Sequence, residues 1–231
     1  SIGCVKAGAG QVTALEINPR ARKFARFNIS LNRIENRIRI VNGDTDIFKP
    51  VRGEKFDYII SNPPFEPTPT DVKNYTHSAA GIYGLNFLRN IFKEVDDCLS
   101  DTGHGQIVTG VPGNDEGPSM LLDLVDQHLP GKTKIIVNPV PVSFDSLMNF
   151  HVLRGLATAE QVNRVKQIAD NDGVTQFYLC VIHYQHGPKR TDIETSDQAY
   201  HQWGLPVKAI SLPKKSIAQL VCQIKNQPKP E

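Results

Sequence analysis

The chain has 231 residues and a formal net charge of +2, from 26 Lys and Arg against 24 Asp and Glu. Apolar residues make up 39% of it, which together with 17 glycines is ordinary for a globular domain. These values exclude a disordered, collagen-like or coiled-coil chain. The near-neutral charge also argues against a protein that coats nucleic acid, and no apolar run approaches the roughly 18 residues of a membrane span.

Cysteine and histidine usage gives no sign of a disulfide scaffold or a metal centre. The four cysteines lie far apart and form no CxxC pair, which indicates a reducing, cytoplasmic location. None of the seven histidines pairs with another at a metal-ligand spacing such as HExxH. We therefore expect no metal and no membrane partner.

Strand and helix patterns alternate along the chain, after an opening segment at 1–8 that is predicted to be helical. Alternating or continuous apolar runs predict strands at 11–16, 38–42, 56–61, 105–111, 134–137 and 174–184. Helical spacing predicts helices at 18–32, 84–100, 119–129 and 159–169. The alternation predicts an α/β fold with a mostly parallel sheet and helices on both faces.

Two of these helices carry further signals. Phe24, Phe27 and Leu31 recur at spacings of three and four residues, so the helix at 18–32 is predicted to be amphipathic. Thr158 followed by Gln161 is a capping box, which begins a helix inside an insert at about 143–173. We expect one domain over 1–187 and a C-terminal extension over 188–231.

Acidic residues follow the first two predicted strands, where ligands of such sheets bind. Glu16 ends the strand at 11–16, where a carboxylate can accept hydrogen bonds from ribose hydroxyls or merely satisfy a helix N-terminus. Asp44 and Asp46 follow the strand at 38–42, where either could accept from an exocyclic amine such as adenine N6. Turn formation is the competing interpretation, because the segment from Gly43 to Asp46 is also a good turn sequence.

The tetrad Asn62-Pro63-Pro64-Phe65 is the strongest signal in the chain. Two prolines directly after a buried strand stop the ladder and stiffen the backbone, and Pro63 restricts Asn62 to extended geometry. The Asn62 side-chain oxygen and the Pro63 carbonyl can then both accept from one planar amino group. Phe65 offers a ring that can stack on the group carrying that nitrogen. Such an arrangement favours attack by the nitrogen on an electrophile.

These residues, in this order, resemble the class I S-adenosylmethionine-dependent methyltransferases. The strand ending at Glu16, the Gly43–Phe48 segment and the Asn62–Phe65 tetrad are similar to the small-domain, HemK-like subgroup that methylates planar nitrogens. The resemblance covers about residues 1–140 and 174–184. It implies a Rossmann-like fold whose last strand is antiparallel, and S-adenosyl-L-methionine as cofactor. It also implies methyl transfer that depends on positioning rather than on a metal or a covalent nucleophile.

The resemblance also implies roles for individual residues. The clamp for the target nitrogen falls on Asn62 and Pro63, with Pro64 and Phe65 completing the catalytic tetrad. Glu16 is similar to the residue that binds the cofactor ribose, and Asp46 to the acid near the adenine amine, with Asp44 as the neighbour that could replace it. The cofactor-binding set is then Gly3, Glu16, Ile17, Asp44, Asp46, Ile47 and Asn62.

The chain departs from this family at its beginning. Ser1-Ile2-Gly3 resembles the last three residues of the family's glycine-rich loop, with Gly3 as the third glycine. We therefore expect an N-terminally truncated domain that lacks the first strand and most of that loop. A chain without the loop is expected to bind the cofactor weakly or not at all, and to be inactive by itself.

Several functional alternatives stay open from the sequence. The methyl acceptor could be a protein glutamine, a nucleobase in RNA or DNA, or a small molecule. A non-catalytic binding or regulatory protein on a decayed methyltransferase fold is the main alternative. A nicotinamide-dependent oxidoreductase would share the ribose-binding acid, although the tetrad counts against it.

Three weaker features could bear on the acceptor. Basic residues between Arg20 and Arg39 could form a nucleic-acid-binding patch or an ordinary solvated face. The long loop Glu66–Ala80, with Asn74, Tyr75 and His77, could be a wall of the substrate site or a mobile surface loop. The insert at 143–173 could be a lid or a packed decoration.

Overall fold

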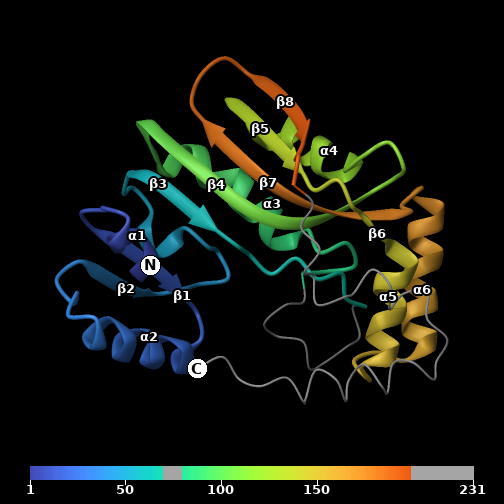
Figure 1. Ribbon diagram of the computed structural model, residues 1–231, viewed down its shortest axis with the longest axis horizontal. Helices are drawn as coiled ribbons and strands as arrows, with labels where there is room; N and C mark the ends of the chain where they lie inside the picture. Colours follow the sequence, from blue (N-terminus) through green and yellow to red (C-terminus); the bar gives the residue numbers. More distant parts are fainter. Residues whose placement is uncertain (70–79, 199–231) are drawn as a thin grey trace.

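The computed structural model describes residues 1–69 and 80–198 of the chain, and Figure 1 shows how its elements are arranged. Two predicted features, the segment containing Asn74, Tyr75 and His77 and the tail after residue 198, lie outside the described residues. In chain order the elements are α1 (Ile2–Lys6), β1 (Val12–Glu16), α2 (Pro19–Leu31), β2 (Ile38–Asn42), the 3₁₀ helix η1 (Lys49–Val51), β3 (Phe56–Ser61), α3 (Asn86–Cys98), β4 (Leu99–Gly113), α4 (Ser119–His128), β5 (Lys132–Val137), β6 (Val142–Ser143), α5 (Phe144–Leu153), α6 (Ala159–Asn171), β7 (Gln176–Gln185) and β8 (Arg190–Thr195).

The strands form two sheets, and the prediction of a mostly parallel sheet was wrong. β1 and β2 pair in parallel as a two-stranded sheet. The six-stranded sheet has the order β3-β4-β7-β5-β8, with β6 paired to β7. β7 lies between β4 and β5 and is antiparallel to both, whereas β3–β4 and β5–β8 are parallel. The larger sheet is therefore mixed, and the predicted antiparallel direction of the strand near residue 180 is confirmed.

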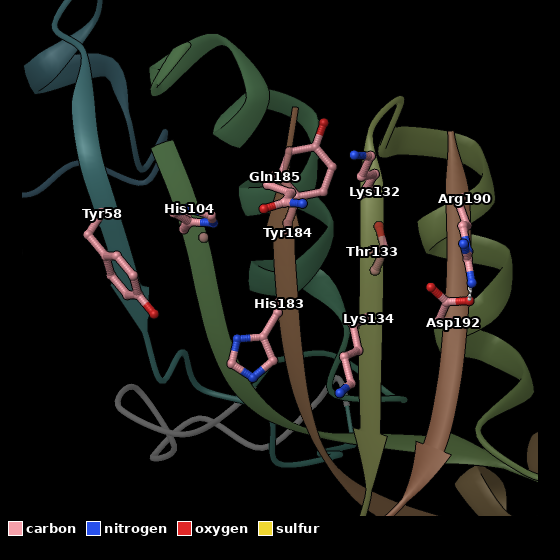
Figure 2. A pocket seen from close by; sticks show the side chains of 11 residues that line it. Tyr58, His104, Lys132, Thr133, Lys134, His183, Tyr184, Gln185, Arg190 and Asp192 are labelled. Carbon is pink, nitrogen blue, oxygen red and sulfur yellow. Dashed lines mark hydrogen bonds and ion pairs between the residues drawn. The ribbon is translucent and has the colours of Figure 1, made fainter. Parts of the chain in front are cut away.

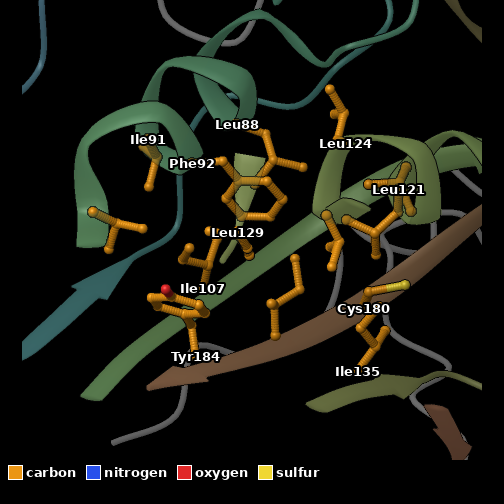
Figure 3. Close-up of a cluster of buried hydrophobic side chains, with 14 of the residues drawn as sticks. Leu88, Ile91, Phe92, Ile107, Leu121, Leu124, Leu129, Ile135, Cys180 and Tyr184 are labelled. Carbon is orange, nitrogen blue, oxygen red and sulfur yellow. The ribbon is translucent and has the colours of Figure 1, made fainter. Parts of the chain in front are cut away.

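The main core lies between the six-stranded sheet and helices α3 and α4. Apolar side chains on one face of β4, β5 and β7, among them Ile107, Ile135 and Ile182, pack against buried side chains of the two helices. Figure 3 shows Phe92, Leu121 and their neighbours meeting this face. Burial of this apolar surface is the main source of stability for the sheet.

The opposite face of the six-stranded sheet is open at β3. Tyr58 is 50% exposed and Ile60 is 59% exposed, whereas Ile59, which points to the other face, packs against the main core. Over the described residues no helix covers this part of the sheet (Figure 1). The expectation of helices on both faces is therefore corrected for this sheet.

Helix α2 begins where the sequence predicted, but its apolar stripe does not face the core. The side-chain oxygen of Asn18 accepts from the backbone N–H groups of Arg20 and Ala21, and Pro19 occupies the first helical position. Phe24, Phe27 and Leu31 are nonetheless 58%, 64% and 70% exposed. The helix packs on β1 and β2 instead through Ile29, in a small cluster with Val5 and Ile38.

The insert forms a separate helical layer with its own small core. α5 and α6 pack against each other and against Phe177 at the start of β7. The predicted capping box is confirmed, because Thr158 Oγ1 accepts from the Gln161 N–H while the Gln161 side chain accepts from the Thr158 N–H. Ser143 caps α5 in the same way, by accepting from the N–H of Ser146.

The sheet continues past residue 187, where the domain was predicted to end. β8 lies inside the predicted extension and pairs with β5 over six residues in parallel register. Within the described ranges, no helix is long and apolar enough to cross a membrane, and no group of three or more potential metal ligands gathers anywhere.

Candidate functional site

The carboxyl end of β1 carries Glu16, held in place by short local hydrogen bonds. One carboxylate oxygen of Glu16 accepts from the Asn18 N–H at 2.8 Å. Its carbonyl accepts from the Gly43 N–H at 2.9 Å and from the Arg22 guanidinium, also at 2.9 Å. A Cβ on Gly43 would lie only 2.7 Å from the Ile17 nitrogen. Glycine at this position therefore lets the ends of β1 and β2 approach each other.

Asp44 is used mainly by the turn that follows β2. Its Oδ1 accepts from the Asp46 N–H at 3.2 Å and from the Thr45 hydroxyl at 3.1 Å, and its Oδ2 pairs with Lys49 at 3.2 Å. The Asp46 N–H, together with Lys49 and Thr45, holds the pKa of the Asp44 carboxyl below its usual value. This supports the turn interpretation for Asp44.

Only one of the two carboxylate oxygens of Asp46 accepts a hydrogen bond from the described residues. Its Oδ2 accepts from Arg52 at 2.9 Å, and Arg52 also reaches Glu94 on α3 at 3.3 Å. Its Oδ1 is buried and has no hydrogen-bond partner among the described residues. A buried carboxylate oxygen without a donor is costly, so a ligand N–H at this point would be favourable. Asp46 fits the predicted adenine contact better than Asp44 does.

The tetrad follows β3 directly, in the position that the sequence predicted. Asn62 is exposed, Pro63 is buried, and Pro64 and Phe65 are half-buried. Leu15 of β1, Ile47 and Ile59 of β3 all pack against the same main core. The main core therefore supports all three segments: the end of β1 with Glu16, the segment after β2 with Asp44 and Asp46, and the end of β3 with the tetrad.

Phe65 is fixed by a ring contact and by two glycines. Its ring lies 6.5 Å from that of Phe177, centroid to centroid. A Cβ on Gly110 would meet Phe177 Cε1 at 2.4 Å and Phe65 Cδ2 at 2.8 Å, and one on Gly84 would meet the Phe65 carbonyl oxygen at 2.1 Å. A side chain at either glycine would therefore fill space that Phe65 occupies. Gly84 also has a φ of +74°, a backbone conformation that favours glycine.

The insert lies against the segments that flank the tetrad, which the sequence did not reveal. The Tyr83 hydroxyl donates to Asp172 Oδ2 at 2.5 Å, at the end of α6, and its ring packs against Phe144 of α5. Burial and the adjacent Asp172 carboxylate raise the pKa of the Tyr83 phenol far above its usual value, so the phenol keeps its proton. His151 of α5 lies beside Glu66, the residue after the tetrad.

The remaining predicted residues lie at the margins of this arrangement. Ile17 is 56% exposed, beyond the end of β1. Gly3 lies in the five-residue helix α1, and a Cβ added there would meet nothing within 4 Å. Their predicted roles at the cofactor stay predictions.

Several side chains of the predicted basic patch are engaged within the chain. Arg22 donates to the Glu16 and Ile17 carbonyls, Arg37 donates to the Ala9 and Gly10 carbonyls, and Arg39 pairs with Glu54 at 2.6 Å. These contacts favour a structural role for the three arginines over a nucleic-acid-binding patch.

A hollow of about 400 Å³ lies away from the tetrad, on the open face of the six-stranded sheet (Figure 2). Tyr58 and His104 line one side, and Lys134 and Asp192 the other. Tyr58 and His104 belong to the early parts of β3 and of its parallel neighbour β4, whereas the tetrad follows the carboxyl end of β3. Because ligands of such sheets bind beyond the carboxyl ends of the strands, this hollow is not the candidate site.

Comparison with known proteins decides the family. Residues 2–111 match the sequence profile described as "Methyltransferase small domain". This segment of the chain is similar to the methyltransferase small-domain family. The resemblance seen in the tetrad and the acids is thereby confirmed, and the chain has a Rossmann-like α/β fold with a mixed sheet.

Curated relatives of the small-domain segment carry names of glutamine methyltransferases. A Methanocaldococcus jannaschii protein, provisionally named a protein N5-glutamine methyltransferase, is 37% identical over 112 residues, which cover 47% of this chain and 54% of that protein. The release factor glutamine methyltransferase of Aquifex aeolicus is 34% identical over 98 residues, covering 39% of this chain and 34% of the relative. The chain therefore spans about half the length of the first relative and about a third of the second.

Similarity to solved structures is weaker. The geranyl diphosphate C-methyltransferase of Streptomyces coelicolor A3(2) is 12% identical with a TM-score of 0.40, over 80% of this chain and 66% of that chain. An O-methyltransferase from a multienzyme of Brevibacillus brevis is 14% identical with a TM-score of 0.40, over 96% of this chain and 72% of that chain.

Proposed function

We propose that the protein is an S-adenosylmethionine-dependent N-methyltransferase whose acceptor is the side-chain amide of a protein glutamine. The Asn62–Phe65 tetrad at the carboxyl end of β3 carries this proposal, since its acceptor oxygens and its ring suit a planar amide nitrogen. The names of the relatives favour glutamine. The internal contacts of Arg22, Arg37 and Arg39 leave less support for a nucleic-acid acceptor.

The residues after β1 and β2 fit the cofactor. The buried Oδ1 of Asp46 has no hydrogen-bond donor among the described residues, and the exocyclic amine of adenine would supply one. Glu16 uses one carboxylate oxygen on Asn18 and keeps the other outside that bond, where it can accept from a ribose hydroxyl. When bound, the cofactor supplies an electrophilic methyl group.

The tetrad's task is to hold the acceptor nitrogen. The Asn62 side-chain oxygen and the Pro63 carbonyl accept from the two N–H bonds of the amide, so that its lone pair, which is perpendicular to the amide plane, faces the methyl group. Transfer breaks the bond between sulfur and methyl, releases S-adenosylhomocysteine as a neutral thioether, and the nitrogen gives up one N–H proton to solvent. Phe65, fixed by Phe177 and Gly110, stacks on that plane. Positioning of this kind can account for most of the rate of a transfer between two bound groups.

The test uses the full-length protein with S-adenosylmethionine carrying a labelled methyl group. Calorimetry measures cofactor binding, and label transfer is followed to a purified release factor, to total RNA and to a metabolite extract. We expect label on the release factor and its loss in Asn62→Ala even at S-adenosylmethionine concentrations that saturate the variant, because Asn62 is also predicted to contact the cofactor. Asn36→Ala, which alters an exposed asparagine far from the tetrad, is the matched control.

Other outcomes have distinct meanings. Label on RNA or on a metabolite would replace the acceptor but keep the tetrad's role. Cofactor binding without transfer to any fraction would favour a non-catalytic binding protein. No binding of S-adenosylmethionine by the full-length protein would overturn the proposal, and binding of NADH in its place would point to an oxidoreductase.

A further inference from the structure

A buried histidine of the insert lies against the residue that follows the tetrad. His151 is on α5 and only 1% of its side chain is exposed, while the Glu66 side chain is 25% exposed. The His151 Nε2 lies 3.3 Å from Glu66 Oε1, a distance that suits an ion pair. Glu66 directly follows Phe65, so this contact connects the insert to the backbone of the tetrad.

The hydrogen-bond partner of His151 Nδ1 determines which ring nitrogen carries a hydrogen. Its Nδ1 lies 3.0 Å from the Leu147 carbonyl oxygen, which can only accept, so Nδ1 carries a hydrogen. In a neutral imidazole Nε2 would then be an acceptor, and it would face the acceptor oxygen of a carboxylate. A hydrogen bond joins the two groups when one proton lies between Nε2 and Oε1.

The backbone around Glu66 is also held. Its carbonyl accepts from the Thr68 hydroxyl at 3.0 Å and from the Ala80 N–H at 3.3 Å. Phe65, one residue earlier, is fixed by Phe177 of β7. The chain leaving the tetrad is therefore tied to the sheet through Phe65 and to the insert through Glu66.

A largely buried polar contact is by itself weak evidence for stability, because the cost of desolvation offsets the attraction. Its place next to the tetrad suggests a different role. We propose that His151 is a positioning residue of the acceptor clamp, which acts by holding the Glu66 carboxylate and with it the backbone that follows Phe65. The insert thereby sets the geometry of the acceptor site. This inference rests on the proposed methyl transfer at the tetrad.

The test compares His151→Phe, Glu66→Ala and Glu66→Gln in the full-length protein, with S-adenosylmethionine carrying a labelled methyl group and a purified release factor as acceptor. We expect His151→Phe and Glu66→Ala each to lower kcat roughly tenfold or more, because small displacements of a bound nucleophile slow transfer strongly. The Kd for S-adenosylmethionine stays as in the wild type. The double variant is no slower than the slower single variant, because both changes remove one contact.

Glu66→Gln separates the contact from the charge. Its amide N–H can donate to the Nε2 of a neutral His151 without a shared proton, so it should recover most of the rate lost in Glu66→Ala. Tyr83→Phe is the control for a loosened insert, since it removes the hydrogen bond to Asp172 on the same helical layer but leaves the pair intact. Thermal melting of each variant reports folding.

The outcomes distinguish failure of the role proposed for His151 from failure of the proposed methyl transfer. Wild-type kcat in both His151→Phe and Glu66→Ala, with Asn62→Ala inactive, would overturn the role of His151 and leave the proposed function standing. Loss of rate in Tyr83→Phe equal to that in His151→Phe would also overturn it, because the effect would then come from insert packing. Full activity in Asn62→Ala would instead sink the proposed function.

Discussion

The ring of Phe65 packs against the ring of Phe177, with centroids 6.5 Å apart and planes inclined by 35°. The two residues come from the tetrad and from the start of β7, and Gly110 of β4 leaves the space in which they meet. The contact joins the candidate acceptor site to the central antiparallel strand.

Gly110→Ala should displace the tetrad ring. The new methyl group would lie 2.4 Å from Phe177 Cε1 and 2.8 Å from Phe65 Cδ2, so one ring must move. Overpacking of this kind costs about 1–3 kcal/mol in the free energy of unfolding, which denaturant titration measures. We also expect slower methyl transfer. Gly105→Ala on the same strand is the matched control, since its nearest contacts would be ordinary ones at 3.6 Å; equal effects of the two changes would contradict the prediction.

Asp46→Ala should weaken cofactor binding by about tenfold, the loss expected for one hydrogen bond to a charged group. The buried Oδ1 is the reason, because it has no other donor among the described residues. Calorimetry with S-adenosylmethionine measures the change. Arg52→Ala is the control, as it breaks the same exposed ion pair but keeps the carboxylate. A similar loss of affinity in Arg52→Ala would show that loop order, not the Asp46 oxygen, is what matters.

Thr158→Ala should destabilise the insert by about 1 kcal/mol, the usual value of a lost helix cap. The threonine hydroxyl accepts from the Gln161 N–H at 3.2 Å, as half of the capping box. Thr158→Ser keeps the hydroxyl and should melt like the wild type. The midpoint of denaturant unfolding provides the measurement, and an unchanged midpoint in Thr158→Ala would count against a contribution from this cap.

Cys180 should resist thiol reagents at mildly alkaline pH. Burial raises the pKa of its thiol to about 12, so the reactive thiolate is scarce until the pH approaches that value. Burial also raises the pKa of Cys98, whereas Cys4 is half-buried near the N-terminus. Alkylation of the native protein at about pH 8, followed by peptide mapping, should label Cys4 well before Cys98 and Cys180. Early labelling of Cys180 would indicate that the centre of β7 opens.

The sequence predicted local elements well, because their signals are local. The capping residues around Thr158 and Asn18 determine where two helices begin, and the tetrad determines where β3 ends. The directions of the strands were harder to predict from the sequence. A buried strand such as β7 has the same apolar character whether its neighbours run with it or against it, so the mixed sheet was not evident from composition.

The contacts of the site between distant segments could not be predicted from one sequence. Glu66 and His151 carry no joint motif, and their approach depends on how the insert packs against the loop after β3. The same holds for Tyr83 and Asp172. Apolar spacing on α2 indicated an amphipathic helix but not the burial of its stripe, which is largely exposed at Phe24 and Phe27.

The division of the strands into two sheets has a consequence for local opening of the native state. β1 and β2 are hydrogen-bonded to each other but share no ladder with β3 among the described residues. The cluster beneath them has three buried side chains, Val5, Ile29 and Ile38, and Leu15 of β1 adds a partly buried contact with the main core. Segments with few buried contacts open at lower free energy than the core. The amides of β1 and β2 should therefore exchange with deuterium sooner than those of β4 and β7. A ligand that binds Glu16 and Asp46 would slow that exchange, because it would connect the end of β1 to the segment after β2.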